Sequence, residues 1–214
     1  ANNSAQSQVL NIPLNQVGLN TKLSVEVTGT ITQAAAEVLT KTQFGIANFF
    51  SNIQLTDLSN YQRVNTTGRH LFLLSSLRRQ LVFGAAYQND SPVNMGSNFK
   101  VNNAPAVVQG AQTFRMFFEI PIAYGEYDLR GAIYAAVTNA TWRLQLTINP
   151  NFIVNAATTD AVGACYQSST ADVGLLSGVT IKVYQHYLDQ IPRGDNGMPI
   201  VPMQSLAYNY LIQS

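Results

Sequence analysis

Apolar and polar residues alternate with a period of two over several long segments of this chain. Between residues 21 and 31, Leu23, Val25 and Val27 alternate with charged or polar neighbours. This period predicts a β-strand with one buried face. The same alternation predicts further strands over residues 52–57, 112–122, 141–149 and 178–188.

Four residues refine the expected strands. Gly29 interrupts the first alternating segment and indicates a bulge or a close neighbour. Trp142 begins the apolar face of the 141–149 strand, which places it in the expected core. Phe117 and Tyr184 lie on the otherwise polar faces of their strands. We therefore expect both faces of these strands to contact other groups.

One helix and two loops complete the pattern. Leucines at three- and four-residue spacing predict a helix over residues 68–81, with Thr66 or Thr67 as its N-cap. Small and polar residues over 84–110 and 155–178 predict two long loops, the first with short strands inside it. Many strands and few helices favour a sandwich or jelly roll. We predict an all-β fold: an antiparallel, eight-stranded jelly-roll sandwich with one inserted helix and two long loops.

The expected domain organisation follows from length and pattern. A chain of 214 residues can hold one large β domain or two small ones. We predict an N-terminal arm over residues 1–20, a jelly-roll domain over residues 21–190 and an exit segment over residues 191–214. The first residues do not resemble a signal peptide, and no apolar run is long enough to span a membrane. The chain begins without Met, so we expect it to be processed, trimmed or partial.

Charge is scarce in this sequence. Only 11% of residues are Asp, Glu, Lys or Arg, and the formal net charge is +1. Ordinary globular domains carry about 25% charged residues. A surface rich in amides and hydroxyls favours association with copies of itself; a secreted or cell-surface β domain is the alternative. Arg78 and Arg79 form the only adjacent basic pair, so we predict no nucleic-acid binding.

Residues that could carry catalysis or bind a metal are few and scattered. His70 and His186 are far apart, so we predict no metal site and assign them to a helix start and a strand face. The single Cys165 cannot form an internal disulfide and has no basic neighbour to activate it. Glu126 and Asp128 share a loop, where carboxylates cap backbone N–H groups more often than they serve catalysis. We predict neither an enzyme nor a cofactor.

Four tyrosines gather late in the chain: Tyr184, Tyr187, Tyr208 and Tyr210. Their rings could form a platform for sugars, so a carbohydrate- or receptor-binding module is the second functional hypothesis. Packing in the core or at a subunit interface, where aromatic residues are enriched, is the interpretation we prefer.

Three segments resemble one virus family, and in the same order. They are Thr42 to Asn48, Pro121 to Ala132, and Val183 to Gly197. All three are similar to runs in the major capsid proteins of tectiviruses, which are tailless icosahedral phages with an internal membrane. The residues that carry the resemblance are Phe44, Gly45, Ala47, Asn48, Pro121, Ala123, Tyr124, Asp128, Leu129, Gly131, Ala132, Tyr184, Gln185, Tyr187, Leu188, Asp189, Gln190, Pro192, Gly194, Asn196 and Gly197.

The resemblance implies both a function and an assembly. Family members carry two jelly rolls in one chain, and three chains form a trimer with a pseudo-hexagonal outline. This chain would be the first jelly roll of a structural capsid protein, located in the virion and assembled in the host cytoplasm. Its partners would be neighbouring capsomers and minor virion proteins, with the internal membrane as a further contact. The signature residues would shape turns and strand ends rather than carry chemistry.

Two departures from the family pattern stand out. The membrane-facing N-terminal helix of the family has no counterpart before the first strand, and the chain ends where the second jelly roll would begin. We therefore expect a fragment or a partly resolved chain. A second half carried by another chain and a single-jelly-roll relative are the alternatives.

Overall fold

The computed structural model describes most of the chain. The described residues are 8–33, 39–42, 44–74, 100–102, 110–125, 128–137, 141–155, 163–168, 175–189, 194–196 and 212–213. Within them the structure contains thirteen strands, one 3₁₀ helix, η1 (Gly45–Phe49), and one α-helix over residues 68–74. The strands are β1 (Val9–Pro13), β2 (Leu19–Gln33), β3 (Leu39–Lys41), β4 (Phe50–Thr56), β5 (Gln62–Thr66), β6 (Lys100–Asn102), β7 (Gly110–Pro121), β8 (Ile133–Tyr134), β9 (Arg143–Ile148), β10 (Ile153–Asn155), β11 (Tyr166–Ser168), β12 (Leu175–Leu188) and β13 (Ile212–Gln213).

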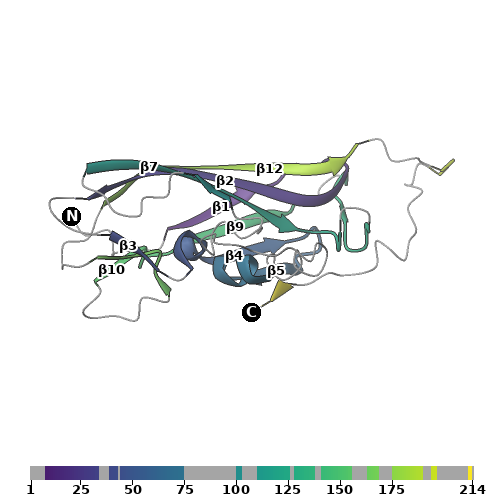
Figure 1. Ribbon diagram of the computed structural model, residues 1–214. Coiled ribbons are helices and arrows are strands. Elements are labelled where there is room, and N and C mark those ends of the chain that lie inside the picture. Colours follow the sequence, from purple (N-terminus) through teal and green to yellow (C-terminus); the bar gives the residue numbers. More distant parts are fainter. Residues whose placement is uncertain are drawn as a thin grey trace.

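Two large sheets form the body of the molecule. The upper sheet has the order β12-β2-β7-β6, with β8 also paired to β2, and the lower sheet has the order β1-β9-β4-β5-β13. Figure 1 shows β7, β2 and β12 as one layer above β1, β9, β4 and β5. A small third sheet, β10-β11-β3, lies at the left end of this view. The neighbours in both large sheets are antiparallel except for β13, which runs parallel to β5.

The long strand β2 organises the upper sheet. Its inward residues Leu23, Val25 and Val27 are fully buried, because alternate side chains of a strand project to the same face. Across the ladder, Val25 lies opposite Phe118 of β7, and Val27 lies opposite Met116. Full burial of an apolar side chain of this kind stabilises a fold by about 1.5–3 kcal/mol. The period-two prediction for this strand is confirmed.

Aromatic residues join the two sheets. Phe49 of η1 lies 5.8 Å from Phe114 of β7 between ring centroids, and Phe50 of β4 lies 5.5 Å from Phe118 of β7. Trp142, which precedes β9, is 2% exposed, and its Nε1–H donates to the backbone oxygen of Asn15 at 3.0 Å. The predicted core position of this tryptophan is confirmed.

The helix begins where the sequence predicts. The Thr67 side-chain oxygen accepts a hydrogen bond from the His70 backbone N–H at 3.1 Å, and the Thr67 carbonyl accepts one from Leu71 N–H. This is the geometry of an N-cap, so the choice between the two predicted caps falls on Thr67. Leu71 and Phe72 are buried against the core. Residues 75–81 of the predicted helix lie outside the described residues.

The chain is an all-β protein with one α-helix among the described residues, as predicted. The count of eight strands is not confirmed, because six of the thirteen strands have only two or three residues. Strands this short carry too little alternation to be recognised in a sequence. Two of them lie within the predicted loops: β6 falls in the segment 84–110, where short strands were expected, and β11 falls in the segment 155–178, where no strand was expected.

Strands also occur on both sides of the predicted domain range 21–190. β1 lies in the predicted arm and pairs with β9, while β13 lies in the predicted exit segment and pairs with β5. Ile212 of β13 is 3% exposed and belongs to the main core. The lower sheet therefore draws strands from both predicted flanking segments.

Candidate functional site

The first signature segment packs against a turn that is distant in sequence. The Asn48 side-chain amide donates to the Ala164 carbonyl at 2.8 Å, and Thr42 Oγ1 donates to the same oxygen. From the other side, the Asn149 amide donates to the carbonyls of Asn48 and Gly163. Phe44, Gly45 and Ala47 complete this segment, and Gly45 has a φ of +47°, which glycine tolerates best.

The second signature segment is a compact loop after β7. Pro121 ends the strand, and the backbone N–H groups of Ile122 and Ala123 both donate to the Thr21 carbonyl. Gly131 has a φ of +85°, and its carbonyl accepts a 2.6 Å hydrogen bond from the buried Arg63 guanidinium. These bonds tie the loop to the start of β2 and to β5.

Asp128 caps this loop, as predicted. Its carboxylate accepts hydrogen bonds from the Arg130 backbone N–H at 3.1 Å and from the Arg130 guanidinium. These bonds hold the Asp128 pKa below its ordinary value. The Arg130 guanidinium also lies 5.0 Å from the ring centroid of Tyr124, which is 47% exposed. Glu126, the other half of the carboxylate pair, lies outside the described residues.

The third signature segment ends the edge strand β12. The Gln185 side chain bonds both the N–H and the carbonyl of Asn15. Gly18 packs so closely under this strand that a Cβ there would lie 2.5 Å from the Leu188 carbonyl oxygen. Tyr187 and Leu188 themselves are exposed.

The segment continues beyond the strand. Asp189 is exposed, and Asp195 and Asn196 form a turn after Gly194. Gln190, Pro192 and Gly197 lie outside the described residues.

The start of β2 brings the second and third segments to one end of the sandwich. Leu19 pairs with Leu188 of β12 on one side and with Tyr134 of β8 on the other. Leu19 also forms a small buried cluster with Ala123 and Ala132, against which Leu129 packs. The sequence separated these segments by about fifty residues, and no local pattern indicated that they meet.

The outward face of the upper sheet carries paired charges, and we call it the charged face. It comprises the side chains of Lys22, Ser24, Glu26, Arg115, Glu119, Lys182, Tyr184 and His186 on neighbouring strands. Lys22 Nζ lies 2.9 Å from Glu119 Oε1, and Arg115 Nε lies 2.6 Å from Glu26 Oε1. His186, predicted on a strand face, is hydrogen-bonded to Ser24 at 2.6 Å.

Glu26 is the centre of the charged face. Tyr184 donates its hydroxyl hydrogen to Glu26 Oε2 at 3.0 Å, on the opposite side of the carboxylate from Arg115. The tyrosine hydrogen bond and the adjacent arginine lower the pKa of Glu26. The same bond raises the pKa of Tyr184. Tyr184, which was expected to contact other groups, uses its hydroxyl inside this network.

The outward face of the lower sheet has a different chemistry, and we call it the amide face. Register pairs place one row of amides straight across its five strands. The row consists of Asn11, Gln145, Gln54, Asn65 and Gln213. Gln54 and Asn52 both donate to Asn65 Oδ1 at 3.4 Å. Because alternate positions of these strands are buried, the row faces outward.

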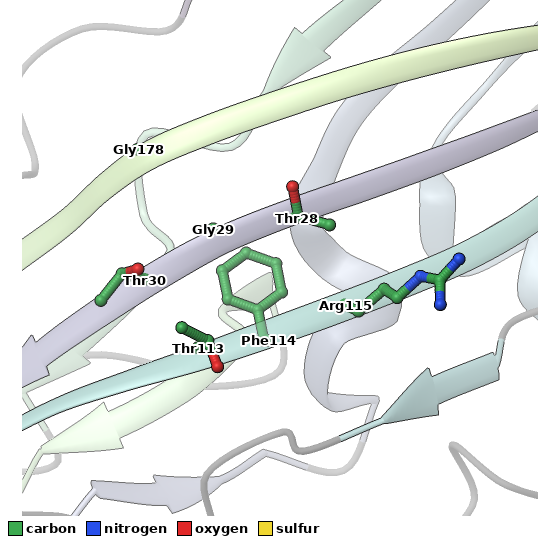
Figure 2. Close-up of a pocket in the computed structure, with 7 residues that line it drawn as sticks. All are labelled: Thr28, Gly29, Thr30, Thr113, Phe114, Arg115 and Gly178. Atoms are coloured by element: carbon green, nitrogen blue, oxygen red, sulfur yellow. The ribbon is translucent and has the colours of Figure 1, made fainter.

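A hollow of about 310 Å³ opens at the bulge of β12 (Figure 2). Its lining residues are Thr28, Gly29, Thr30, Thr113, Phe114, Arg115 and Gly178. The Phe114 ring lies beside Gly29, where an added Cβ would come within 2.8 Å of it. The close neighbour that the sequence predicts for Gly29 is therefore confirmed. The Arg115 side chain extends away from Gly29 toward its partner Glu26. The hollow contains threonine hydroxyls but no acid or histidine.

The described residues show no grouping suited to metal binding. Among them, no three His, Cys, Asp or Glu side chains gather at one point. Cys165 is fully buried, and its burial raises the pKa of the thiol well above the ordinary value. Within the same residues, no helix is long and apolar enough to cross a membrane.

Comparison with known proteins decides the family. Residues 1–191 match the family model described as P3 major capsid protein N-terminal. This chain belongs to that family. A related protein, the major capsid protein P3 of Enterobacteria phage PRD1, is 32% identical over 211 residues, which cover 96% of this chain and 53% of the relative. The chain therefore spans about half the length of this curated relative.

Two solved structures are more distant. The crystal structure of the STIV MCP has a TM-score of 0.39 and 14% identity, covering 68% of this chain and 44% of that chain. The atomic structure of Sulfolobus Turreted Icosahedral Virus has a TM-score of 0.37 and 17% identity, covering 68% and 42%. The family assignment rests on the sequence matches.

Proposed function

We propose that this chain is a structural building block of an icosahedral viral shell and not an enzyme. The observation that carries this proposal is its membership of the P3 major capsid protein N-terminal family across residues 1–191. Its place would be the capsid shell of the virion, after assembly in the host cytoplasm. The scarcity of charge supports the same role, because weak electrostatic repulsion permits many copies to pack together.

We propose a jelly-roll arrangement for the two large sheets. Its support is the pairing of strands that are distant in sequence: β2 lies between β7 and β12, and β4 lies between β5 and β9. Within this arrangement, residues 1–20 would act as an arm, residues 21–190 as the jelly-roll domain and residues 191–214 as an exit segment. β1 and β13 would then extend the lower sheet at its two edges.

The signature residues would serve this fold rather than chemistry. Asn48 holds the turn at Ala164, Asp128 caps its loop, and Gly131 presents its carbonyl to Arg63. Each of these contacts fixes a loop at a strand end. Tyr187, Leu188 and Asp189 differ because they face solvent, so they are available for contacts between chains.

The proposed assembly is a homotrimer with a pseudo-hexagonal outline, surrounding an internal membrane. Neighbouring capsomers and minor virion proteins would be further partners, and direct nucleic-acid binding is not expected. The carbohydrate-binding alternative is not favoured, since Tyr184 uses its hydroxyl within the charged face. Tyr208 and Tyr210 lie outside the described residues.

Light scattering behind size exclusion, applied to the whole protein, tests the proposal. A mass three times that of one chain is the expected result. Immunogold labelling of purified virions should then place the protein in the shell. A chain that stays monomeric at every concentration and is missing from purified virions would contradict the proposed function.

A further inference from the structure

Most charged side chains described by the structure are already paired within the chain. Among the acids, Glu26, Asp57, Glu119 and Asp128 each form an ion pair. Two acids in the described part of the chain form none, namely Asp189 and Asp195, and both are exposed after the end of β12. Among the described residues, the unpaired negative charge is therefore concentrated in one short segment.

Among the positively charged side chains that the structure describes, one is also without a partner in the chain. Arg69 lies over the Phe44 ring, and Lys182 lies directly across the ladder from Glu26. Of the cations whose side chains are described, only Arg143 has neither an ion pair nor a ring contact nor an acid opposite it in the sheet. Arg143 is exposed at the start of β9, at the corner of the amide face.

Arg143 lies on a cleft of about 220 Å³, which we call the Arg143 cleft. Its other lining residues are Asn11, Pro13, Thr56, Asn60, Thr141 and Trp142. The exposed Pro13 provides apolar surface beside the buried Trp142, while the amides and hydroxyls provide hydrogen-bonding groups. A guanidinium beside apolar surface suits a ligand in which a carboxylate follows an apolar group.

The end of β12 carries an apolar side chain followed by a carboxylate. Leu188 is 47% exposed and is followed directly by the unpaired Asp189. The exposed large apolar residues of the described chain are Val9, Tyr61, Leu73, Tyr124, Val137, Tyr184, Tyr187 and Leu188. Of these, only Leu188 is adjacent in sequence to an acid without an ion pair. Within one chain, Asp189 and Arg143 form no ion pair with each other.

We propose that the Leu188–Asp189 end of β12 in one copy docks into the Arg143 cleft of a second copy. The Asp189 carboxylate accepts hydrogen bonds from the Arg143 guanidinium, and Leu188 covers Pro13. Asp189 and Arg143 are oppositely charged and form no ion pair within one chain, and this charge complementarity selects a second copy of the chain as the occupant. This inference rests on the proposed function, since it requires that copies associate.

A charge-swap experiment in the whole protein tests this contact. The variants are Arg143→Glu, Asp189→Arg and the double variant, and the readout is the association constant from sedimentation velocity. Each single variant should weaken association about tenfold or more, because it places like charges together in a desolvated contact. The double variant should recover most of the loss, because the pair is restored with exchanged signs.

Matched controls separate the contact from general charge effects. Asp195→Arg makes the same change of charge six residues away, and Lys182→Glu changes a cation on the opposite sheet. Both should leave association within about threefold of wild type. Thermal unfolding of every variant checks folding, since the substituted side chains are all exposed.

The outcomes are distinct. Loss in both single variants and recovery in the double variant supports the inference. If the single variants associate like wild type, or the double variant is no better than they are, the inference is overturned while the associating wild type upholds the proposed function. A wild-type protein that does not associate and is absent from virions overturns both.

Discussion

The two large sheets share one core but present opposite chemistry to solvent. On the charged face, two ion pairs and a tyrosine–glutamate hydrogen bond lie side by side on β2, β7 and β12. On the amide face, five amides cross the sheet in one row, and Arg143 is the charged residue at its corner. Both sheets arise from the same alternation of apolar and polar positions.

The difference shows how a chain with few charges uses them. On the charged face, the ion pairs form between side chains of the same face, so these side chains hold one another in place. Glu26 is only 8% exposed although it lies on an outward face. Amides donate and accept equally, so a row of them needs no partner of opposite sign. The amide face can therefore meet another surface without leaving an unpaired charge buried, except at Arg143. Four predictions test this contrast, beginning with the core that both sheets share.

Replacement of Trp142 by alanine should have the largest effect. The side chain is 2% exposed and belongs to the common core, so the change leaves a cavity and removes the hydrogen bond to Asn15. We expect the free energy of unfolding to fall by about 3–5 kcal/mol. Urea denaturation measures this loss. A loss below about 1 kcal/mol would show that the residue does not support the core.

The hollow in the upper sheet allows a finer comparison between two glycines. Gly29→Ala places a Cβ 2.8 Å from the Phe114 ring, which is 2% exposed and has little room to move. We expect this overpacking to cost roughly 1–3 kcal/mol in urea denaturation.

Gly178 provides the matched control for Gly29. A Cβ there meets nothing within 4 Å, but its φ of +59° disfavours alanine, by about 1–2 kcal/mol. Gly178→Asn should recover part of that cost because asparagine tolerates positive φ. Gly29→Asn should be worse than Gly29→Ala. Equal behaviour of asparagine at the two positions would contradict this distinction between steric crowding and backbone conformation.

Acid should weaken the charged face and leave the amide face unchanged. The Glu26 pKa is lower in the folded protein than its ordinary value, so the folded state binds this proton less readily than the unfolded state. The resulting stabilisation is complete above the ordinary glutamate value, about 4.3, and is lost as pH falls through the folded pKa. Glu26→Gln removes this contribution.

Urea midpoints measured between pH 6 and pH 3 check this expectation. Wild type should lose more stability over this interval than Glu26→Gln does. Gln145→Ala on the amide face should follow the wild-type pH profile, since it changes no titrating group. Identical pH profiles for wild type and Glu26→Gln would show that the carboxylate network does not contribute to acid sensitivity.

The smallest effect is expected on the amide face itself. Gln145→Ala removes a partly exposed side chain that makes no side-chain hydrogen bond among the described residues, so the free energy of unfolding should change by less than about 0.5 kcal/mol. Differential scanning calorimetry can set this limit. A loss above about 1.5 kcal/mol would mean that the amide row stabilises the sheet and is not a free surface.

Local pattern was sufficient for the long elements. The alternation around Val25 predicts β2, and Thr67 was one of two caps expected from the residues alone. Apart from the short strands expected within residues 84–110, the short strands were not predicted, because two or three residues cannot display a period. β13 is the clearest case: Ile212 and Gln213 become a strand only because β5 offers them a free edge.

The signature residues show the same division. The resemblance to a capsid family depends on three short sequence motifs, and the family match across residues 1–191 confirms it. The contacts that these residues make in the folded chain could not be predicted from the motifs. Asn48 depends on the carbonyl of Ala164, and Gly131 depends on Arg63, partners that are 116 and 68 residues away.

The sequence by itself therefore determined the fold class, the buried faces of the long strands and the family. Only the tertiary structure decided which polar residues share a face, where the unpaired charges lie, and that the second and third signature segments meet at Leu19. The physical reason is that alternation is a local property of one strand. Sheet order and register arise from pairing between strands far apart in the chain, and that pairing places the amide row and the Arg143 cleft.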